Sequence, residues 1–315
     1  MTTRLTGLIA ATHTPFDANG DLNLAAVEKQ AELLIRTGVS GVFIAGTTGE
    51  SQSLSLGERL ALSQRWSEVV RSTSLRLIVH VGSNCLPDAR ELASQAEKLG
   101  VAGIAAVAPS YFKAKTVETL VACCEQIASA APGTPFYYYD IPSMTGLTVP
   151  MPEFLDLSSK KIPTMAGLKF SNPDLLTFQL LVNRQEGRFD IPWGTDEFFL
   201  GALALGATCA VGSSYNFAAP ISNRLLAAFA AGDWKQARVE QFRSAQLIDL
   251  LIRNGFMASG KAVMGMLGVD VGPARLPNGS LTPTQAASLR KDLEVLGFFD
   301  WLKACENSKT AFISR

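Results

Sequence analysis

Gly41-Val-Phe-Ile-Ala-Gly-Thr47 is a short apolar run, and runs of this kind decide the fold of the chain. Stretches with helical periodicity lie between them, such as residues 24–35, and Ser55 with Glu58 has the spacing of a capping box. Runs that are apolar throughout are typical of parallel strands buried on both faces. Eight such runs occur: Gly7–Thr12, Gly41–Thr47, Leu75–Gly82, Gly103–Pro109, Pro135–Pro142, Met165–Ser171, Phe189–Gly194 and Cys209–Ser214.

Repeated strand–helix units predict an α/β fold, a closed (β/α)8 TIM barrel. An open doubly wound sheet is the alternative, but the glycine-rich GxGxxG pattern of its dinucleotide-binding members is absent after the first strand. After Asn216 the strand signals stop, and the pattern predicts helices at 221–231, 234–255, 258–267 and 286–296. We therefore expect a catalytic barrel over residues 1–232 and a C-terminal helical extension over residues 233–315 that helps subunits associate.

Composition argues against several classes of function. The 315 residues carry a formal net charge of zero, which gives no electrostatic attraction to nucleic acid or an anionic membrane. No apolar run reaches the ~20 residues that span a bilayer, and the first residues lack the apolar segment of a secretory signal, so we expect a cytoplasmic protein.

The metal-ligating residue types are scattered. The chain has two histidines and no CxxC pair, so a zinc site is not expected, nor is any other cofactor. We expect the cysteines to be reduced thiols without a catalytic role: Cys85, Cys123, Cys124, Cys209 and Cys305.

Lys169 is the most informative residue, and it lies in the sixth run, Ala166-Gly-Leu-Lys-Phe-Ser171. Lysine is almost never fully buried without a partner. An amine in a dry pocket can serve as the nucleophile that attacks a ketone to form an imine. The alternative is a lysine whose stem packs while its head reaches water, and this alternative is favoured when Lys169 is considered by itself. Because barrel active sites lie at the C-terminal ends of strands, the other strand ends decide between these interpretations.

The second run ends in Ala45-Gly-Thr-Thr-Gly-Glu50. Two glycines around two hydroxyl residues predict a tight turn that presents Thr47, Thr48 and backbone N–H groups to a carboxylate or phosphate. An ordinary turn that caps the following helix explains the motif equally well.

The fifth run reads Phe136-Tyr-Tyr-Tyr-Asp-Ile-Pro142. Side chains alternate along a strand, so Tyr137 and Tyr139 share one face and Tyr138 takes the other. A phenol is a weak acid, so at the barrel mouth it would act as a hydrogen-bonded proton shuttle. Core packing of all three tyrosines is the alternative.

Polar residues also end the last two runs, in Trp193-Gly-Thr-Asp-Glu197 and Gly212-Ser-Ser-Tyr-Asn216. Asp196 and Glu197 could bind sugar hydroxyls, although capping of the next helix is the commoner role of such residues. A lysine, a tyrosine and two threonines at one end of a barrel together fit a Schiff-base aldolase that acts on a 2-keto acid.

The motifs GTTGE, YYYDIPSMTG, GLKFS and GSSYN resemble those of the dihydrodipicolinate synthase and N-acetylneuraminate lyase superfamily over essentially the whole chain. The spacing between Tyr139 and Lys169 is also typical of it. GTTGE alone would mark only the superfamily. The detail is most similar to the animal-type lyases, in the segments Ile78–Gly82, Ala131–Tyr139, Thr164–Phe170 and Gly272–Pro277.

This resemblance implies reversible, cofactor-free cleavage of N-acetylneuraminate to pyruvate and N-acetylmannosamine. Lys169 would form the imine with the C2 ketone, and Tyr139 would take the proton of the C4 hydroxyl as the C3–C4 bond breaks. Thr47 and Thr48 match the carboxylate-binding and proton-relay positions. Tyr111 matches an aromatic residue lent to the neighbouring subunit of a homotetramer. The positions that hold the hydroxyl tail are matched by Ser171, Gly194, Asp196, Glu197 and Ser213.

The chain departs from the family pattern at two places. Ser143-Met-Thr-Gly146 lacks the arginine with which the synthase branch binds a second carboxylate, which disfavours a synthase. Asp140 stands where animal-type lyases usually have histidine; we expect a structural role, with an effect on Tyr139 or on sugar preference as the alternative.

Two other functions stay open at this point. One is a 2-keto-3-deoxy sugar acid aldolase with the same imine chemistry. The other is a sugar-acid-binding protein without turnover, which Lys169 and Tyr139 disfavour.

Overall fold

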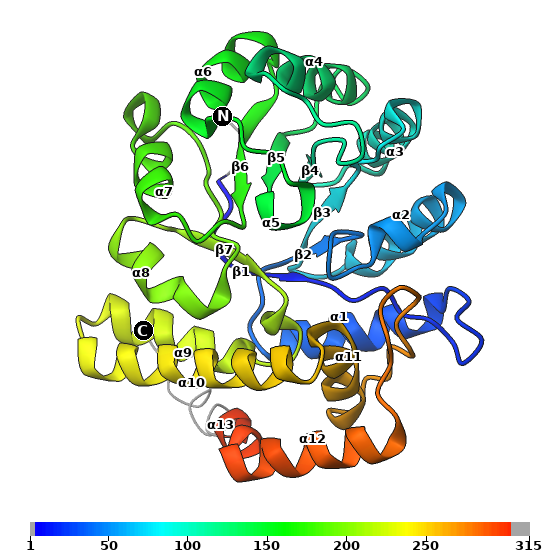
Figure 1. Cartoon of the computed structure of the whole chain (residues 1–315), viewed down its shortest axis with the longest axis vertical. Coiled ribbons are helices and arrows are strands. Elements are labelled where there is room, and N and C mark those ends of the chain that lie inside the picture. The colour runs from blue at the N-terminus through cyan, green and yellow to red at the C-terminus, as the bar shows by residue number, and fades with distance from the viewer. Residues whose placement is uncertain (1–3, 304–315) are drawn as a thin grey trace.

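Parallel strands form the centre of the structure, a computed structural model that describes residues 4–303 (Figure 1). Seven strands are hydrogen-bonded in the order β6-β5-β4-β3-β2-β1-β7, and every pair is parallel. The strands are β1 (Gly7–Ala11), β2 (Gly41–Ile44), β3 (Arg76–His80), β4 (Gly103–Ala106), β5 (Phe136–Asp140), β6 (Met165–Phe170) and β7 (Cys209–Gly212).

The seventh predicted run, Phe189–Gly194, is not a regular strand, yet it closes the barrel. It forms isolated bridges to β6 and β7. On one side Phe170 N donates to Pro192 O (2.9 Å), and on the other Trp193 N donates to Cys209 O (3.0 Å). Pro192 has no N–H group, so the ladder through this segment is interrupted. The expected closed α/β barrel is confirmed, with this segment in the place of one strand.

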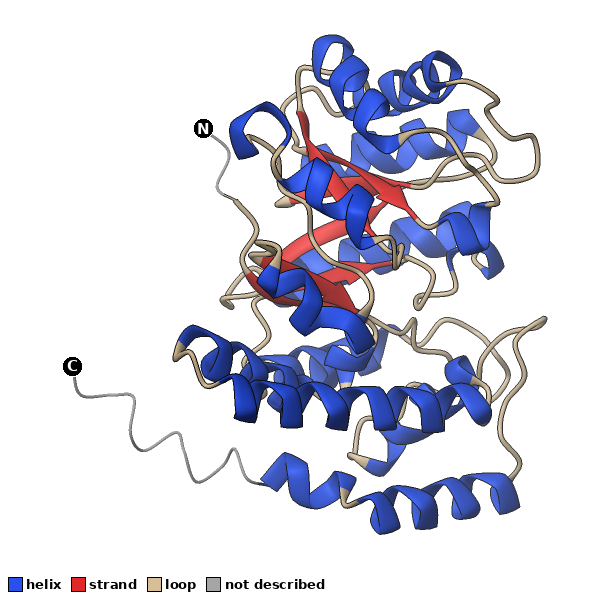
Figure 2. Cartoon of the chain, turned by 60° about the vertical axis from the view of Figure 1, so that its left-hand side comes forward, coloured by secondary structure: helices blue, strands red, loops and turns tan. Residues whose placement is uncertain are grey.

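Helices surround the strands, as Figure 2 shows with the red sheet inside the blue helices. The apolar outer faces of the strands pack against them in one core, whereas Ile9, Phe43, Tyr137 and Tyr139 belong to a smaller cluster inside the barrel. The helices of the barrel are α1 (Val27–Arg36), α2 (Leu56–Val70), α3 (Leu86–Leu99), α4 (Val117–Ala128), α5 (Pro142–Thr145), α6 (Met151–Lys161), α7 (Leu175–Val182), α8 (Phe199–Ala204) and α9 (Ala219–Ala230).

Further helices follow α9 and lie together beside one side of the barrel (Figure 1). They share an apolar cluster with Leu33 of α1 and with Phe217 and Ile221 of the barrel. These helices are α10 (Trp234–Arg253), α11 (Phe256–Met266), α12 (Pro283–Leu296) and α13 (Phe298–Lys303).

The predicted capping box at the start of α2 is confirmed. Glu58 N donates to Ser55 Oγ (3.2 Å), and Ser55 N donates to Glu58 Oε2 (2.8 Å). The two bonds satisfy donors that a helix leaves free at its start. Among residues 4–303, no helix is both long and apolar enough to cross a membrane.

Candidate active site

The Lys169 amine lies inside the barrel between two aromatic rings. Lys169 and Tyr139 are directly paired in the β5–β6 register, so their side chains share a face. Lys169 Nζ is 3.7 Å from the centre of the Tyr139 ring and 4.1 Å from that of Phe43. The lysine is 4% exposed, and a positive charge over ring faces is favoured. The interpretation of Lys169 as a surface lysine therefore fails.

The Tyr139 hydroxyl is bonded to the turn after β2. It lies 3.1 Å from Thr47 Oγ1, and either atom can donate. A phenol that shares a proton with a neighbouring hydroxyl can pass it on without being a free base. The structure thus joins Lys169, Tyr139 and Thr47 in one contiguous group.

His80 also contacts this group, and it was not among the site residues predicted from the sequence. Its ring meets that of Tyr139 edge-on, with centres 5.9 Å apart, and its Nδ1 lies 2.8 Å from Ala45 O. Val107 N donates to Nε2 (3.3 Å), so Nδ1 carries the proton of a neutral ring. Burial holds the pKa of His80 well below its usual value, and the charges of Arg59 and Lys169 act in the same direction. His80 is therefore a neutral donor to the turn that carries Thr47.

Ala45 is a point of backbone strain at the start of that turn. Its φ is 52°, in the left-handed region that residues with a Cβ rarely adopt. The bond from His80 holds the Ala45 carbonyl, and Arg59 in turn donates to His80 O (2.7 Å) and Gly82 O (2.9 Å). These contacts connect β3 to the turn after β2.

A second group of polar residues joins the turn after β2 and the segment that ends at Asp196 to the residues that follow β7. Thr48 Oγ1 lies 2.5 Å from Ser213 Oγ. The Asp196 carboxylate accepts bonds from Ser214 N (2.9 Å) and Ser214 Oγ (2.6 Å), so it does not cap the helix that follows it. Burial raises the pKa of Asp196, while the Ser214 bonds and the charge on Lys169 oppose this shift. Asp196 is a fixed acceptor close enough to Lys169 to sense its charge.

Ser171 and Gly194 are in close contact at the ends of β6 and the segment beside it. A Cβ on Gly194 would lie 2.0 Å from Ser171 Oγ and 3.0 Å from Ser171 Cα, so only glycine fits. Glu197 is partly buried, and burial raises its pKa.

Tyr111 is the one predicted site residue that lies apart from these groups. It is 80% exposed and contacts Phe112, with ring centres 5.0 Å apart. Asn84 Oδ1 accepts bonds from the backbone N of Ser110 (2.8 Å) and Tyr111 (3.1 Å), which fixes the loop. Within a single chain, Tyr111 therefore does not complete the site.

Asp140 lies on the other face of β5 from Tyr139. It shares that face with Tyr138, whose ring packs on Phe154 in the helical layer (centres 4.6 Å apart). Asn172 Nδ2 donates to Asp140 Oδ2 (3.4 Å), and burial raises the pKa of Asp140 to about 6. These contacts are with the outer layer, which favours the structural role.

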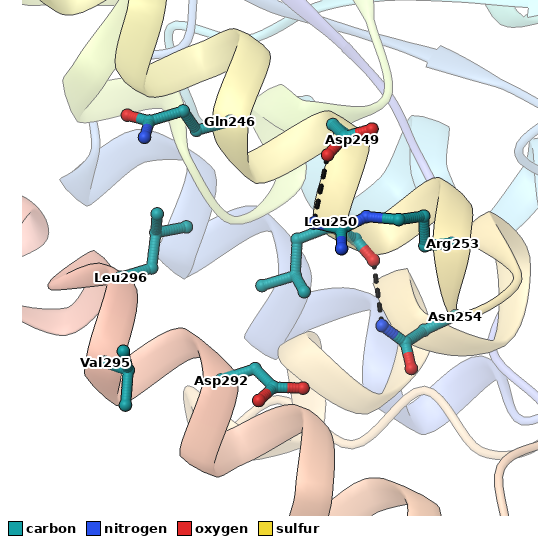
Figure 3. Close-up of a pocket in the computed structure, with 8 residues that line it drawn as sticks. All are labelled: Gln246, Asp249, Leu250, Arg253, Asn254, Asp292, Val295 and Leu296. Carbon is teal, nitrogen blue, oxygen red and sulfur yellow. Dashed lines mark hydrogen bonds and ion pairs between the residues drawn. The ribbon is translucent and has the colours of Figure 1, made fainter.

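Residues 4–303 hold no group of three or more His, Cys, Asp or Glu side chains able to bind a metal ion. The cysteines in this range, Cys85, Cys123, Cys124 and Cys209, are free thiols, and Cys305 lies outside the described residues. A separate pocket between α10 and α12 is lined by Leu250, Asp292 and Val295 among others (Figure 3). None of the predicted site residues lines it.

The model of the dihydrodipicolinate synthetase family matches residues 4–296. The chain belongs to this family. Its match covers all the strands and every predicted site residue.

Relatives named N-acetylneuraminate lyase are similar to the chain along almost its full length. The protein from Rattus norvegicus is 39% identical, over 95% of this chain and 94% of its own length. The protein from Homo sapiens is 40% identical, over 94% of this chain and 95% of its own.

Solved structures of the dihydrodipicolinate synthetase family and of lyases share the fold. The N-acetylneuraminate lyase of Proteus mirabilis superposes with a TM-score of 0.91 at 39% identity, covering 94% of this chain and 100% of that one. A DHDPS from Cyanidioschyzon merolae gives a TM-score of 0.85 at 29% identity, covering 92% of this chain and 97% of that one. Of these two structures, the lyase is the more similar to this chain in both sequence and fold.

Proposed function

We propose that this protein is a Schiff-base aldolase that cleaves N-acetylneuraminate reversibly to pyruvate and N-acetylmannosamine. The observation that carries the proposal is the buried Lys169 amine over the Tyr139 ring, with the Tyr139 hydroxyl 3.1 Å from Thr47 Oγ1. Relatives named N-acetylneuraminate lyase, alike over almost the whole chain, support the choice of substrate.

The reaction would begin with attack of Lys169 Nζ on the C2 ketone of the open-chain sugar. Loss of water gives a protonated imine, which accepts the electron pair of the C3–C4 bond. As this bond breaks, the Tyr139 oxygen takes the proton of the C4 hydroxyl and passes its own proton through Thr47 Oγ1 to the substrate carboxylate, which then supplies the proton for C3. The C4 carbon leaves as the aldehyde N-acetylmannosamine. Protonation of the enamine at C3 and hydrolysis of the imine then release pyruvate and restore the amine.

The remaining residues would bind the two ends of the substrate. Thr47, Thr48 and the N–H groups of their turn would hold the carboxylate. At the other end Asp196, fixed by Ser214, would accept bonds from sugar hydroxyls, and the other tail contacts would come from Ser171, Gly194, Glu197 and Ser213.

Assembly and location are further parts of the proposal. The exposed Tyr111–Phe112 pair supports a homotetramer in which Tyr111 reaches a neighbouring subunit's site. The free thiols in the described part of the chain are usual in a reducing compartment, which supports the cytoplasm. The extension over residues 233–315 would then pack on the barrel at residues 1–232 and serve the assembly.

The test is to incubate the protein with N-acetylneuraminate, reduce with borohydride and map the adduct by peptide mass spectrometry. We expect a pyruvate-sized adduct on Lys169 and none on a Lys169→Arg variant. An adduct the size of the whole sugar would show binding without cleavage. An adduct with pyruvate but none with N-acetylneuraminate would support the aldolase chemistry and contradict the proposed substrate.

A further inference from the structure

We propose that the C-terminal helices position the two ends of the substrate site separately, through Lys261 of α11 and Gln241 of α10. Lys261 holds the turn Ala45–Glu50 at the keto-acid end, and Gln241 holds the turn at Asp196 and Glu197 at the sugar-tail end. The assignment of these ends to parts of the substrate rests on the proposed function.

Glu50 ends the first turn in a strained backbone conformation. Its φ is 54°, in the left-handed region, which a residue with a Cβ keeps only if its surroundings hold it there. Its side chain is fully buried, and Glu50 Oε1 is 2.9 Å from Lys261 Nζ. Glu50 Oε2 accepts a bond from Arg275 N (2.8 Å). The charge that fixes Glu50 therefore comes from the C-terminal part of the chain.

Lys261 reaches the same turn by a second route. Its Nζ also donates to Thr14 O (2.9 Å) and to Pro273 O (2.8 Å). Thr14 Oγ1 in turn donates to Gly49 O (2.6 Å). One buried amine thus fixes the two residues that follow Thr47 and Thr48.

The loop between α11 and α12 reinforces this contact. It lies beside the N-terminal loop (Figure 1). Arg275 donates to Gly20 O of that loop (2.8 Å) and to Ser53 O, which follows the turn Ala45–Glu50 (2.9 Å). Lys261 Nζ and the Arg275 guanidinium lie 4.3 Å and 4.2 Å from the centre of the Phe16 ring. Such contacts of cations with one aromatic ring add to the ion pair.

Gln241 makes the corresponding contact at the other end of the site. Its Nε2 donates to Glu197 O (2.9 Å) and Asp196 O (3.3 Å), and its Oε1 accepts from Leu200 N (2.6 Å). One side chain thus fixes the start and the end of the short turn that presents both carboxylates. The two contacts come from different helices and reach different turns, so their effects should be separable.

Kinetics in the synthesis direction measure the two ends of the site separately, because pyruvate has only the keto-acid end of the product and N-acetylmannosamine has only the sugar tail. For Lys261→Met we expect the KM for pyruvate to rise about tenfold. The pyruvate concentration that gives half-maximal borohydride trapping on Lys169 should rise by the same factor, and the KM for N-acetylmannosamine should stay unchanged. Arg243→Met is the control, since it removes an ion pair to the buried Glu240 in the same group of helices.

For Gln241→Met we expect the opposite pattern, with the KM for N-acetylmannosamine raised about tenfold and pyruvate trapping unchanged. Gln236→Met is the matched control. It removes an amide from the same helix, but this amide donates to Glu240 Oε1 (2.8 Å) and not to a turn of the site. Hydrogen exchange gives a readout independent of activity. It should rise over residues 46–51 in Lys261→Met and over residues 196–200 in Gln241→Met.

The inference fails if both variants change both substrates alike, or if the controls give the same changes. If Lys261→Met does not fold, the double variant Glu50→Gln with Lys261→Met removes both charges of the pair and is measured instead. If the wild-type protein traps pyruvate but does not use N-acetylmannosamine, the proposed substrate fails, while pyruvate trapping and hydrogen exchange still decide the inference.

Discussion

The Tyr139 side chain has two separable parts, a ring under the Lys169 amine and a hydroxyl bonded to Thr47. Tyr139→Phe removes only the hydroxyl. We expect the kcat for N-acetylneuraminate cleavage to fall by about 10²- to 10⁴-fold, because the proton of the C4 hydroxyl loses its acceptor. Borohydride should still trap pyruvate on Lys169, since the ring that packs on the amine remains. Loss of trapping together with cleavage would mean that the hydroxyl positions the amine instead.

Asp140 makes the stability of the protein depend on pH. Burial raises its pKa from its usual value of 3.8 to about 6, so between these values the folded state binds more protons than the unfolded state. The contribution of Asp140 to the free energy of unfolding therefore falls as pH rises through this window, and the full penalty is present above it. Asn172 can still donate to an amide oxygen at this position, so Asp140→Asn removes the penalty and keeps the contact.

We expect Asp140→Asn to match the wild type near pH 4 and to be more stable by roughly 3 kcal/mol at pH 7.5, as a two-unit shift implies. Urea unfolding at several pH values measures the difference. An equal difference at every pH would show that the carboxyl does not titrate in this range.

Lys169, Tyr139 and Thr47 could be found from the sequence because each stands at the end of an apolar run. Phe43 could not, because an apolar or aromatic residue is ordinary within such a run, and His80 was not singled out although it lies within the third run. Their importance comes from the curvature of the sheet, which turns β2 and β3 toward the Tyr139 ring. For His80, the available signal was a histidine that follows three apolar residues of a buried strand.

At the scale of elements, the segment that closes the barrel was predicted in place but not in form. Its residues are apolar enough for a strand, and its backbone bonds to β6 and β7 as expected. Pro192 removes one donor, and Gly194 follows where the chain passes close to Ser171. Gln241 and Lys261 were missed for a different reason. Their partners are 44 and 211 residues away in sequence, which no local pattern shows.

Substitution of Gly194 tests how closely the segment that closes the barrel packs against the end of β6. In Gly194→Ala the new methyl would meet Ser171 Cα at 3.0 Å, and a change of side-chain rotamer cannot relieve a clash with backbone. We expect a loss of about 1–3 kcal/mol in the free energy of unfolding, as for other overpacked sites, and a higher KM for the sugar. Thermal unfolding and steady-state kinetics measure the two effects. Gly57→Ala is the control, since nothing lies within 4 Å of the added Cβ.

At the scale of the whole molecule, the loop between β4 and α4 carries two aromatic side chains that a single chain leaves in solvent. Tyr111 is 80% exposed and Phe112 is 84% exposed, while Asn84 holds the backbone of the loop in place. A rigid loop that presents large apolar groups is typical of an interface between subunits. The proposed contribution of Tyr111 to a neighbouring subunit's site then requires at least a dimer.

We expect Phe112→Asp to dissociate the assembly, because a charge would be buried against the neighbouring subunit, and to lose activity in the same concentration range. Sedimentation velocity and kcat measured over a dilution series test the link. Val295→Asp, which replaces an 82% exposed residue of α12, is the control. Tyr111→Phe separates assembly from chemistry, since it keeps the ring and removes only the hydroxyl. We expect that variant to sediment like the wild type with a lower kcat. A monomer that keeps full activity would refute the exchange of Tyr111 between subunits, while leaving the chemistry of Lys169 within each barrel intact.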